Sequence, residues 1–412
     1  MSIPSLEFLV ALLAISAFFF HIPAGARRGV LAAGNVLLLW TLVPNAASWL
    51  FLVVFLLGGF GLGLLLRTMP RRSILAAYLA ILLASFVIAQ KYAVLSFVLP
   101  PRFLAHTVSV VGLSYMLFRQ IHFAVDAMQG QIKHCSLWTY LNYQLSCFAL
   151  VAGPIQRYQA FDGYWHDPRP RLQEPHELRR AYLRILVGVV KIAGLAAACE
   201  FGAEKLAERL LSVEVGTYNP GAAATLLIFM ARFYLYPAYV YLNFSGYCDV
   251  VIGGAALLGQ ELPENFDRPY LARNMIDFWN RWHRTLTFWI RDYVFTPMYK
   301  AIAERAPQRA GSLAFLCYFV GLFLAGLWHG STWNFVIFGL LHAVAVSAAK
   351  VWENHLIKRR GRSGLKRYLS SGRIRAFAIA ANLHFTCFTL AFFPADLDRT
   401  WRMFKGVLRS IG

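Results

Sequence analysis

One histidine in the sequence has a setting that suits proton transfer. His329 separates two strongly apolar runs in the segment 321–342, GLFLAGLWHGSTWNFVIFGLLH, and Gly326, Gly330 and Ser331 lie beside it. Small residues let a backbone or a substrate approach closely. An imidazole with a pKa of about 6.5 can stay neutral at neutral pH and accept a proton as a general base. His329 is therefore a candidate catalytic base, and the alternative is a histidine that holds two helices together by a hydrogen bond.

A second polar segment, 274–293, has the sequence NMIDFWNRWHRTLTFWIRDY. If it forms one helix, spacings of three and four place its large apolar residues in one stripe, with arginines and threonines around the rest and His283 at the border. The stripe consists of Trp279, Trp282, Leu286, Trp289 and Tyr293. Such a helix is too charged to face lipid on all sides, so it needs a water-filled cavity or protein around it. The alternative is an interfacial helix with a tryptophan belt and arginines that reach the headgroups.

The sequence lacks the motifs of several common enzyme classes. It contains no G-x-S-x-G nucleophile elbow, no phosphate-binding loop and no dinucleotide fingerprint. His283, His329 and His342 lack the i, i+4 spacing of a helical metal pair, so we expect no metal and no bound cofactor. His342, near the far end of an apolar run, fits a structural role. Without an activated serine or cysteine, transfer chemistry requires an acceptor hydroxyl that a histidine deprotonates and that attacks a bound acyl donor directly.

The composition places these segments in a membrane. Of the 412 residues, 58% are hydrophobic and 15% are charged, and the mean hydropathy is +0.51. Soluble domains carry roughly 25% charged residues, so this chain is short of groups to cover a water-facing surface. Disorder, a collagen-like structure and a small disulfide scaffold are excluded, and the six cysteines include no C-x-x-C pair. The apolar runs predict an all-α, polytopic integral membrane protein with about ten to thirteen membrane-embedded helices.

Breaks between the apolar runs define the expected spans. A first span is expected at 4–20, and Pro44-Asn45 divides the region 30–66 into two more, because proline ends a helix. A 3/4 apolar periodicity at 396–411 predicts an interfacial amphipathic helix capped by Asp396 or Asp398. Further apolar spans are expected at 74–99, 103–125, 137–154, 181–203, 222–243, 246–259, 312–328, 333–351 and 374–393.

The charge is explained mainly by membrane topology. Forty Lys+Arg against 20 Asp+Glu give a formal net charge of +20, and the basic residues gather between spans, as in 67–72, 157–184 and 358–375. Cytoplasmic loops carry such an excess. Arg27, Arg28 and the cluster at 67–72 are therefore expected in the cytoplasm, with the N-terminus outside. No basic stripe with interleaved aromatic residues stands clear of the spans, which excludes nucleic acid as a partner.

Four blocks and the C-terminal segment resemble a known family. The blocks are Gly153-Pro154-Ile155 with Arg157-Tyr158, NFSGYCDVVIGGAALLG (243–259) with PENFDRPY (263–270), DFWNRWHRTLTFWIRDYVFTP (277–297) and GLWHGSTWNFVIFGLLHA (326–343), and CFTLAFFPADLDRTW (387–401) also fits. Together they resemble the membrane-bound O-acyltransferase family, in the bacterial branch of alginate O-acetylation and teichoic-acid D-alanylation membrane proteins. The resemblance implies a single domain over 1–412, with peripheral spans in 1–110, a core at 115–401 and helices in a ring around a central funnel.

The resemblance also implies roles for individual residues. His329 matches the family's membrane-embedded catalytic histidine, and His283 matches its second histidine, which assists substrate binding. Residues of the same blocks are expected to bind substrate, namely Trp282, Arg281, Trp279, Asn243, Asp249, Trp328 and Asn334. Many relatives have Asp where this chain has Asn243, so a charge is lost there.

The predicted function is acyl transfer across a bacterial cytoplasmic (inner) membrane. A short acyl group, acetyl in the leading hypothesis, would pass from a cytoplasmic thioester, either acyl-CoA or an acyl carrier protein, to a hydroxyl of a cell-surface glycan or an extracellular relay acyltransferase. The alternative is D-alanyl transfer from an acidic carrier protein to a teichoic-type polymer. Membrane lipids are expected partners in both cases. A transporter or flippase would predict an inverted repeat, which the sequence lacks, and a structural scaffold would leave the polar segment unexplained.

Overall fold

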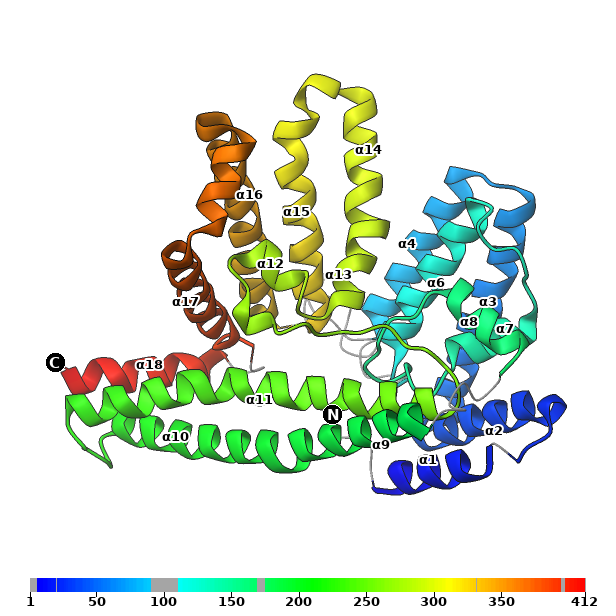
Figure 1. Cartoon of the computed structure of the whole chain (residues 1–412), viewed down its shortest axis with the longest axis horizontal. Coiled ribbons are helices and arrows are strands. Elements are labelled where there is room, and N and C mark those ends of the chain that lie inside the picture. The colour runs from blue at the N-terminus through cyan, green and yellow to red at the C-terminus, as the bar shows by residue number, and fades with distance from the viewer. Residues whose placement is uncertain are drawn as a thin grey trace. The chain divides into compact units, whose positions relative to one another are not determined.

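A computed structural model describes residues 6–19, 21–89, 110–168, 175–330, 332–393 and 397–411. These residues form helices and connecting turns without a strand, which confirms the all-α prediction (Figure 1). Parts of the predicted spans 4–20, 74–99 and 103–125 lie outside the described residues, as do Ser331 and the cap candidate Asp396. Contacts divide the chain into two units, Met1–Gly188 with Tyr247–Glu264 and Val189–Gly246 with Asn265–Gly412.

Several helices have the length and hydropathy of membrane spans. Among the described residues, five helical segments are long and apolar enough to cross a bilayer, and Leu313–His329 is a shorter apolar helix. The five are Ala46–Thr68, Arg72–Ala89, Pro175–Val215, Ala222–Leu257 and Trp333–Ser370. The chain is thus a polytopic helical membrane protein, as predicted. The larger number of embedded helices and their arrangement around a funnel stay predictions.

The first unit begins with helices whose ends follow local sequence signals. Its helices are α1 (Leu6–Phe19), α2 (Ala24–Leu42), α3 (Ala46–Thr68), α4 (Arg72–Ala89), α6 (Leu113–Met128), α7 (Leu137–Gln144), α8 (Tyr158–His166) and α9 (Pro175–Val189). The break predicted at Pro44-Asn45 is confirmed, because α2 ends at Leu42 and α3 begins at Ala46. The Asn45 side-chain oxygen accepts a hydrogen bond of 2.8 Å from the Ser48 N–H and thereby caps α3.

The predicted span 137–154 is wrong. Only α7 forms there, and the chain then turns irregularly into the block that begins at Gly153. The buried guanidinium of Arg119 donates hydrogen bonds of 2.8 Å to the carbonyl oxygens of Tyr143 and Gln144, so it satisfies carbonyls that a continuing helix would have bonded. Pro154 has no N–H to extend a helix. The contact of Arg119 with the end of α7 therefore accompanies the early end of this helix.

The second unit holds the two segments with candidate chemistry. Its elements are η2 (Val190–Ala196), α10 (Ala197–Val215), the first part of α11 (Ala222–Leu257), η3 (Pro269–Leu271), α12 (Met275–Trp279), α13 (Arg284–Ile290), η4 (Arg291–Phe295), α14 (Thr296–Arg305), α15 (Pro307–His329), α16 (Trp333–Ser370), α17 (Gly372–Leu390) and α18 (Leu397–Ile411). α15 packs against both α14 and α16 (Figure 1). At the crossing of α15 and α16, a Cβ on Gly326 would overlap the backbone of Gly339, so two glycines permit the close approach.

Three helices are longer than predicted. The spans 222–243 and 246–259 form one helix, α11, which continues through Pro237. The Pro237 carbonyl also accepts a hydrogen bond of 2.6 Å from the Tyr270 hydroxyl, a contact between α11 and η3 that the sequence does not reveal. The span 181–203 likewise lies within the continuous helical segment Pro175–Val215. The basic block at 358–375 lies mostly in the last part of α16, which continues past the predicted span 333–351 and is broken by a kink at Gly361, where φ is +67°.

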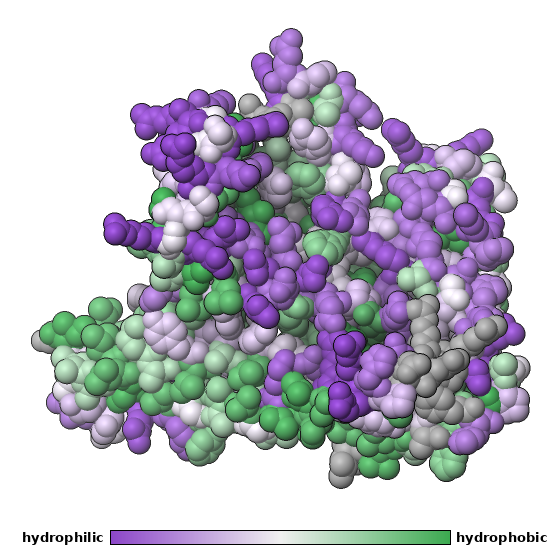
Figure 2. All heavy atoms as spheres, in the orientation of Figure 1, coloured by the Kyte–Doolittle hydropathy of each residue, from purple (hydrophilic) through white to green (hydrophobic). Residues whose placement is uncertain are grey.

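The C-terminal helix is amphipathic, and its small and basic residues face the protein. Thr400, Met403 and Gly406 are buried, and α18 packs on α10. Arg399 and Arg402 pair with Glu204 and Glu214 of α10. Trp401, Leu408 and Ile411 are 54%, 63% and 66% exposed, and Figure 2 shows apolar atoms over the region of α18 and α11. These three side chains therefore face outward, as an interfacial helix requires, while Phe404 of the same helix packs against Phe229.

Candidate active site

The polar segment around His283 is not one helix. α12 ends at Trp279, α13 begins at Arg284, and His283 lies between them in the left-handed region at φ +43°. The predicted continuous stripe is therefore wrong. Its physical cause is backbone pairing with residues 265–267, because the Asp267 N–H donates to the Arg281 carbonyl and the Arg284 N–H donates to the Asn265 carbonyl, each at 2.9 Å. These bonds occupy groups that a continuous helix would use internally.

Asn265 is a residue of the site that the sequence analysis missed. Its side chain is fully buried, and its oxygen Oδ1 lies 3.2 Å from the Thr285 N–H donor, 2.8 Å from Thr285 Oγ1 and 3.2 Å from Nδ1 of His283. It thereby joins the first turn of α13 and the histidine ring to the chain before α12. The only signal in the sequence is a polar residue in the block PENFDRPY, and nothing local shows that its side chain contacts His283.

His329 is the last residue of α15. Its ring lies among aromatic rings, with centroid distances of 4.8 Å to Trp328, 5.2 Å to Phe393 and 6.0 Å to Phe338. The chain turns at Gly330, where a Cβ would overlap the ring of Phe335. His329 is half-buried, whereas His283 is only 1% exposed. Of these two rings, the one predicted to be the base is the one that retains surface for a substrate.

The structure brings the two histidine segments together. The ring of Trp328 lies between them, 6.1 Å from the His283 ring and 4.8 Å from the His329 ring between centroids. His329 also interacts electrostatically with His283, so a charge on one ring affects the other. The predicted pairing of these histidines in one site is thus consistent with the geometry of the second unit.

His342 is a third histidine of this region, and its contacts fit the structural role expected for it. It is 1% exposed, and its Nε2 lies 2.8 Å from Thr389 Oγ1. The Thr389 hydroxyl donates to the Thr386 carbonyl at 2.9 Å, so Nε2 of His342 is the donor of the first bond. One nitrogen of His342 therefore joins α16 to α17.

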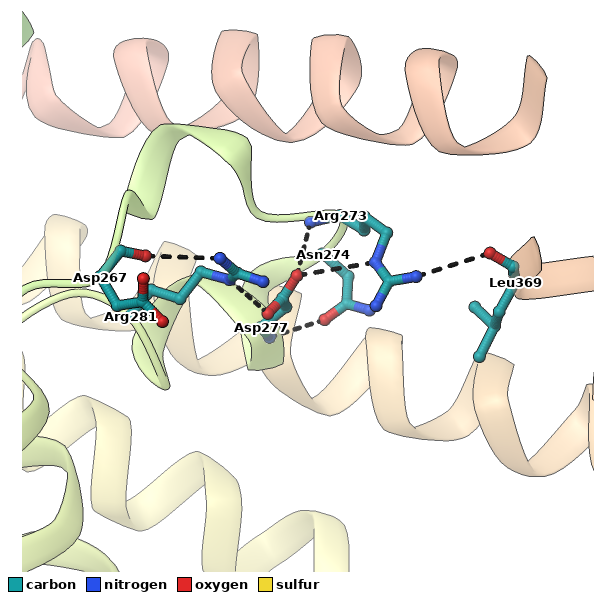
Figure 3. A network of polar contacts seen from close by, with 6 residues as sticks. All are labelled: Asp267, Arg273, Asn274, Asp277, Arg281 and Leu369. Atoms are coloured by element: carbon teal, nitrogen blue, oxygen red, sulfur yellow. Dashed lines mark hydrogen bonds and ion pairs between the residues drawn. The ribbon is translucent and has the colours of Figure 1, made fainter. Parts of the chain in front are cut away.

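The side chain of Arg281 belongs to a network of polar contacts that holds it in place (Figure 3). Its Nε donates to a carboxylate oxygen of Asp277 at 2.7 Å. The other carboxylate oxygen of Asp277 accepts from the Arg273 N–H at 3.0 Å, and the side-chain oxygen of Asn274 accepts from the Asp277 N–H at 2.8 Å. The hydrogen bond to Asp277 raises the pKa of Arg281, so the guanidinium stays charged. The network fixes α12 on the N-terminal side of His283.

The remaining predicted binding residues have different surroundings. Trp279 and Trp282 are 4% and 7% exposed, in an apolar cluster with Phe278 and Val346. Asn334 is buried in the first turn of α16. Trp328 contacts both histidines, as described above. Their proposed contacts with substrate stay predictions.

Two predicted binding residues lie on α11. Asn243 is half-buried in the second unit and precedes Phe244, whose ring packs against His283 with centroids 4.9 Å apart. Asp249 belongs to the first unit and pairs with Arg184 at 3.1 Å, so its carboxylate already has a cationic partner.

A buried histidine–aspartate pair in the first unit has a structural function. His122 accepts a hydrogen bond of 2.8 Å from the Tyr158 N–H at Nε2, and its Nδ1 lies 3.3 Å from Asp126. Both ring nitrogens are therefore engaged, and the pair fixes the chain at Arg157-Tyr158. The block Gly153-Pro154-Ile155 with Arg157-Tyr158 thus includes a residue whose backbone is held by a buried histidine.

Comparison with known proteins identifies the family of this chain. The profile of the membrane-bound O-acyltransferase family matches residues 102–391 of this chain. The chain belongs to that family. It is a membrane O-acyltransferase, as the resemblance implied, and both histidine segments lie within the matched region.

Relatives from both predicted branches are found. The teichoic acid D-alanyltransferase of Streptococcus thermophilus is 26% identical over 71% of this chain and 69% of the relative. That of Bacillus subtilis is 28% identical over 68% of this chain and 67% of the relative. A probable alginate O-acetylase of Pseudomonas aeruginosa is 28% identical over 60% of this chain and 44% of the relative. This O-acyltransferase is therefore similar to both kinds of enzyme, and it spans less than half of the alginate relative.

Proposed function

We propose that this O-acyltransferase moves a short acyl group from a thioester donor to a hydroxyl, with His329 as the general base. The observation that carries the proposal is the position of His329. It is a half-buried imidazole at the end of an apolar helix, surrounded by aromatic rings, and the ring of Trp328 contacts both it and a second histidine. Such a site excludes much of the water that would hydrolyse the donor.

The reaction balances with these groups alone. A ring nitrogen of His329 takes the proton of the acceptor hydroxyl while the hydroxyl oxygen attacks the thioester carbonyl carbon. The tetrahedral intermediate expels the thiolate as the carbon–sulfur bond breaks, and the imidazolium returns the proton to that sulfur. The products are an ester and a free thiol, and no bound cofactor takes part. The thioester, acyl-CoA or an acyl carrier protein, is a co-substrate.

Two helix ends beside His329 support this charge separation. α15 ends at His329, and the partial negative charge of its last carbonyl groups favours the imidazolium that forms. α16 begins four residues later at Trp333 without a side-chain cap, and its first N–H groups favour the oxyanion of the intermediate. The helix-end effect on each charge is typically 0.3–1 kcal/mol, up to about 2 kcal/mol where the geometry is partly buried.

His283 is proposed to bind and orient the substrates. His283 is buried, and its hydrogen-bond partner Asn265 lies 18 residues earlier in the chain. The rings of Phe244 and Trp328 both pack against its ring. A fixed ring so close to the base can hold a donor or acceptor group in place, which lowers the entropic part of the barrier.

Substitution of the base tests the proposal. His329→Ala should lower ester formation by roughly 10²–10⁴-fold, the contribution of a general base. His166→Ala removes a histidine with an exposed side chain in the first unit and should leave activity unchanged. Ester is measured as acyl groups released from cell-surface material by mild alkali, with protein amounts determined in the same membranes. Full acylation by His329→Ala at an unchanged protein amount would reject the base.

The same assay identifies the acyl group. Acetate in the released material supports the acetyl hypothesis, which rests on the alginate-type blocks Gly153-Pro154-Ile155 and Leu327-Trp328-His329-Gly330. D-alanine supports the alternative, which rests on the fuller coverage of the teichoic acid relatives. If an acidic carrier protein is the donor, charge reversal at Arg71 and Arg72 should weaken its binding at low salt. The bacterial inner membrane and an extracellular relay acyltransferase are the corresponding proposals for location and partner.

A further inference from the structure

The chemistry of hydrogen-bond donors determines which tautomer His283 adopts. The Thr285 N–H can only donate, so the atom of Asn265 that lies 3.2 Å from it is the carbonyl oxygen Oδ1. That same oxygen lies 3.2 Å from Nδ1 of His283. Since an oxygen of an amide accepts and never donates, Nδ1 must carry the hydrogen. In a neutral imidazole, the lone pair is then on Nε2.

The ring of His283 is held from several sides in this state. Phe244 contacts it edge-on at 81° with centroids 4.9 Å apart, and Trp328 contacts it at 65° and 6.1 Å. The backbone of His283 is in the left-handed region, which residues other than glycine adopt only at a cost in free energy. Surrounding structure must compensate for that cost, and the hydrogen bonds between 281–284 and 265–267 do so. Strain of this kind occurs mainly at functional sites.

We propose that Asn265 is a positioning residue for His283, whose Nδ1–H it holds so that Nε2 faces the acyl-transfer site as a hydrogen-bond acceptor. The inference rests on the proposed function, because it assigns a purpose to the second histidine of that site. Asn265 has two separate structural tasks, since its oxygen also caps α13 through Thr285. An experiment must therefore distinguish the effect on the ring from the effect on the helix.

Asn265→Asp makes this distinction. Aspartate is also a good N-cap, so its carboxylate still accepts from the Thr285 N–H and the fold is retained. The carboxylate also adds a negative charge next to Nδ1, which stabilises the imidazolium form of His283. His329 is a second titratable group of this region, and the ring of Trp328 contacts both histidine rings. At neutral pH, more of His283 is then protonated at Nε2 and cannot accept a hydrogen bond, so activity falls and recovers as the pH rises.

The probes are acetyl-coenzyme A and a D-alanyl thioester of a carrier protein, with purified protein in lipid vesicles and cell-surface material as acceptor. Ester formation is measured across about pH 5 to 8. For Asn265→Asp we expect the lower limb of the pH profile to move to higher pH. Asn265→Ala should lose as much activity as His283→Ala, about 10²-fold for a group that positions substrate. Thr285→Val is the matched control, because it removes a donor to Oδ1 and leaves the bond to His283 in place.

The outcomes separate this inference from the proposed function. An unshifted pH profile for Asn265→Asp, or a loss of activity that is equal at every pH, overturns the positioning role. So does a loss of activity in Thr285→Val as large as that in Asn265→Ala, which would show that the side-chain contact of Asn265 with α13, and not the bond to His283, is what matters. Full activity of His329→Ala overturns the proposed function itself, whatever Asn265 does. If Asn265→Ala fails to accumulate in membranes, the profile of Asn265→Asp decides alone.

Discussion

Asp277 and Arg281 illustrate, at the scale of single residues, how charges in the site segment serve its architecture. The Asp277 carboxylate contacts both Arg281 and Arg273, while Arg273 also reaches the Leu369 carbonyl at 3.5 Å. Arg281 is 28% exposed at its side chain, so solvent screens the pair only in part. The sequence predicts Arg281 as a substrate-binding residue. Because Asp277 is its hydrogen-bond partner, we expect Asp277 to determine the orientation of the Arg281 guanidinium.

A double-mutant comparison tests this dependence. Asp277→Asn and Arg281→Gln should each lower the melting temperature in detergent, because each removes the same charge-assisted hydrogen bond. The double variant should melt no lower than the less stable single variant. Arg291→Gln is the control, since its pair with Asp292 has side chains that are 59% and 38% exposed and is expected to contribute little. Fully additive shifts would show that the two residues act independently.

At the scale of elements, the crossing of α15 and α16 positions His329. Gly326 lies one turn before His329 and packs against Gly339 of α16, where there is no space for a side chain. The ends of both helices meet next to the base, so their separation determines whether the helix-end charges act at the reacting atoms. Close packing here is therefore a condition for the chemistry as well as for stability.

Gly326→Ala should disturb this crossing. The added methyl group meets backbone atoms that cannot rotate away, so the helices must separate, at a typical cost of 1–3 kcal/mol. We expect a lower melting temperature and a loss of ester formation even though His329 is unchanged. Gly372→Ala is the matched control, because a Cβ there meets nothing within 4 Å. Unchanged activity and stability of Gly326→Ala would contradict the close crossing.

At the scale of the whole molecule, the distribution of charge predicts the topology. The formal net charge is +20, and the basic residues gather in segments such as 67–72 and 358–375 while the span helices are strongly apolar. A membrane protein retains such segments on the cytoplasmic side. Donor thioesters and acidic carriers would then meet a basic surface, which increases their rate of association.

Labelling with a membrane-impermeant maleimide tests this topology. Arg72→Cys and Lys366→Cys, each in a chain whose six native cysteines are replaced by serine, should react only after the cells are permeabilised. A peptide tag at the N-terminus should be accessible in intact cells. Ester formation by the serine-substituted chain confirms that it folds. Labelling of Arg72→Cys in intact cells would reverse the predicted orientation.

The sequence by itself determined the class of protein and most of its helices. Apolar runs encode membrane helices locally, and Asn45 encodes its own cap, because such signals act over a few neighbouring residues. The sequence also predicts His329 as a functional residue, because an ionisable side chain between apolar runs is costly. The early end of α7 at the Arg119 contacts and the continuation of α11 through Pro237 had no such local signal.

Only the tertiary structure decided the form of the site around His283. The periodicity of 274–293 favours one helix, yet backbone hydrogen bonds from 265–267 break it and leave His283 in the left-handed region. The tertiary structure also places Asn265 next to the His283 ring and directs Arg399 and Arg402 of α18 toward α10. The physical reason is that a helical pattern records only neighbours three or four residues apart, whereas these hydrogen bonds and ion pairs join residues distant in the chain.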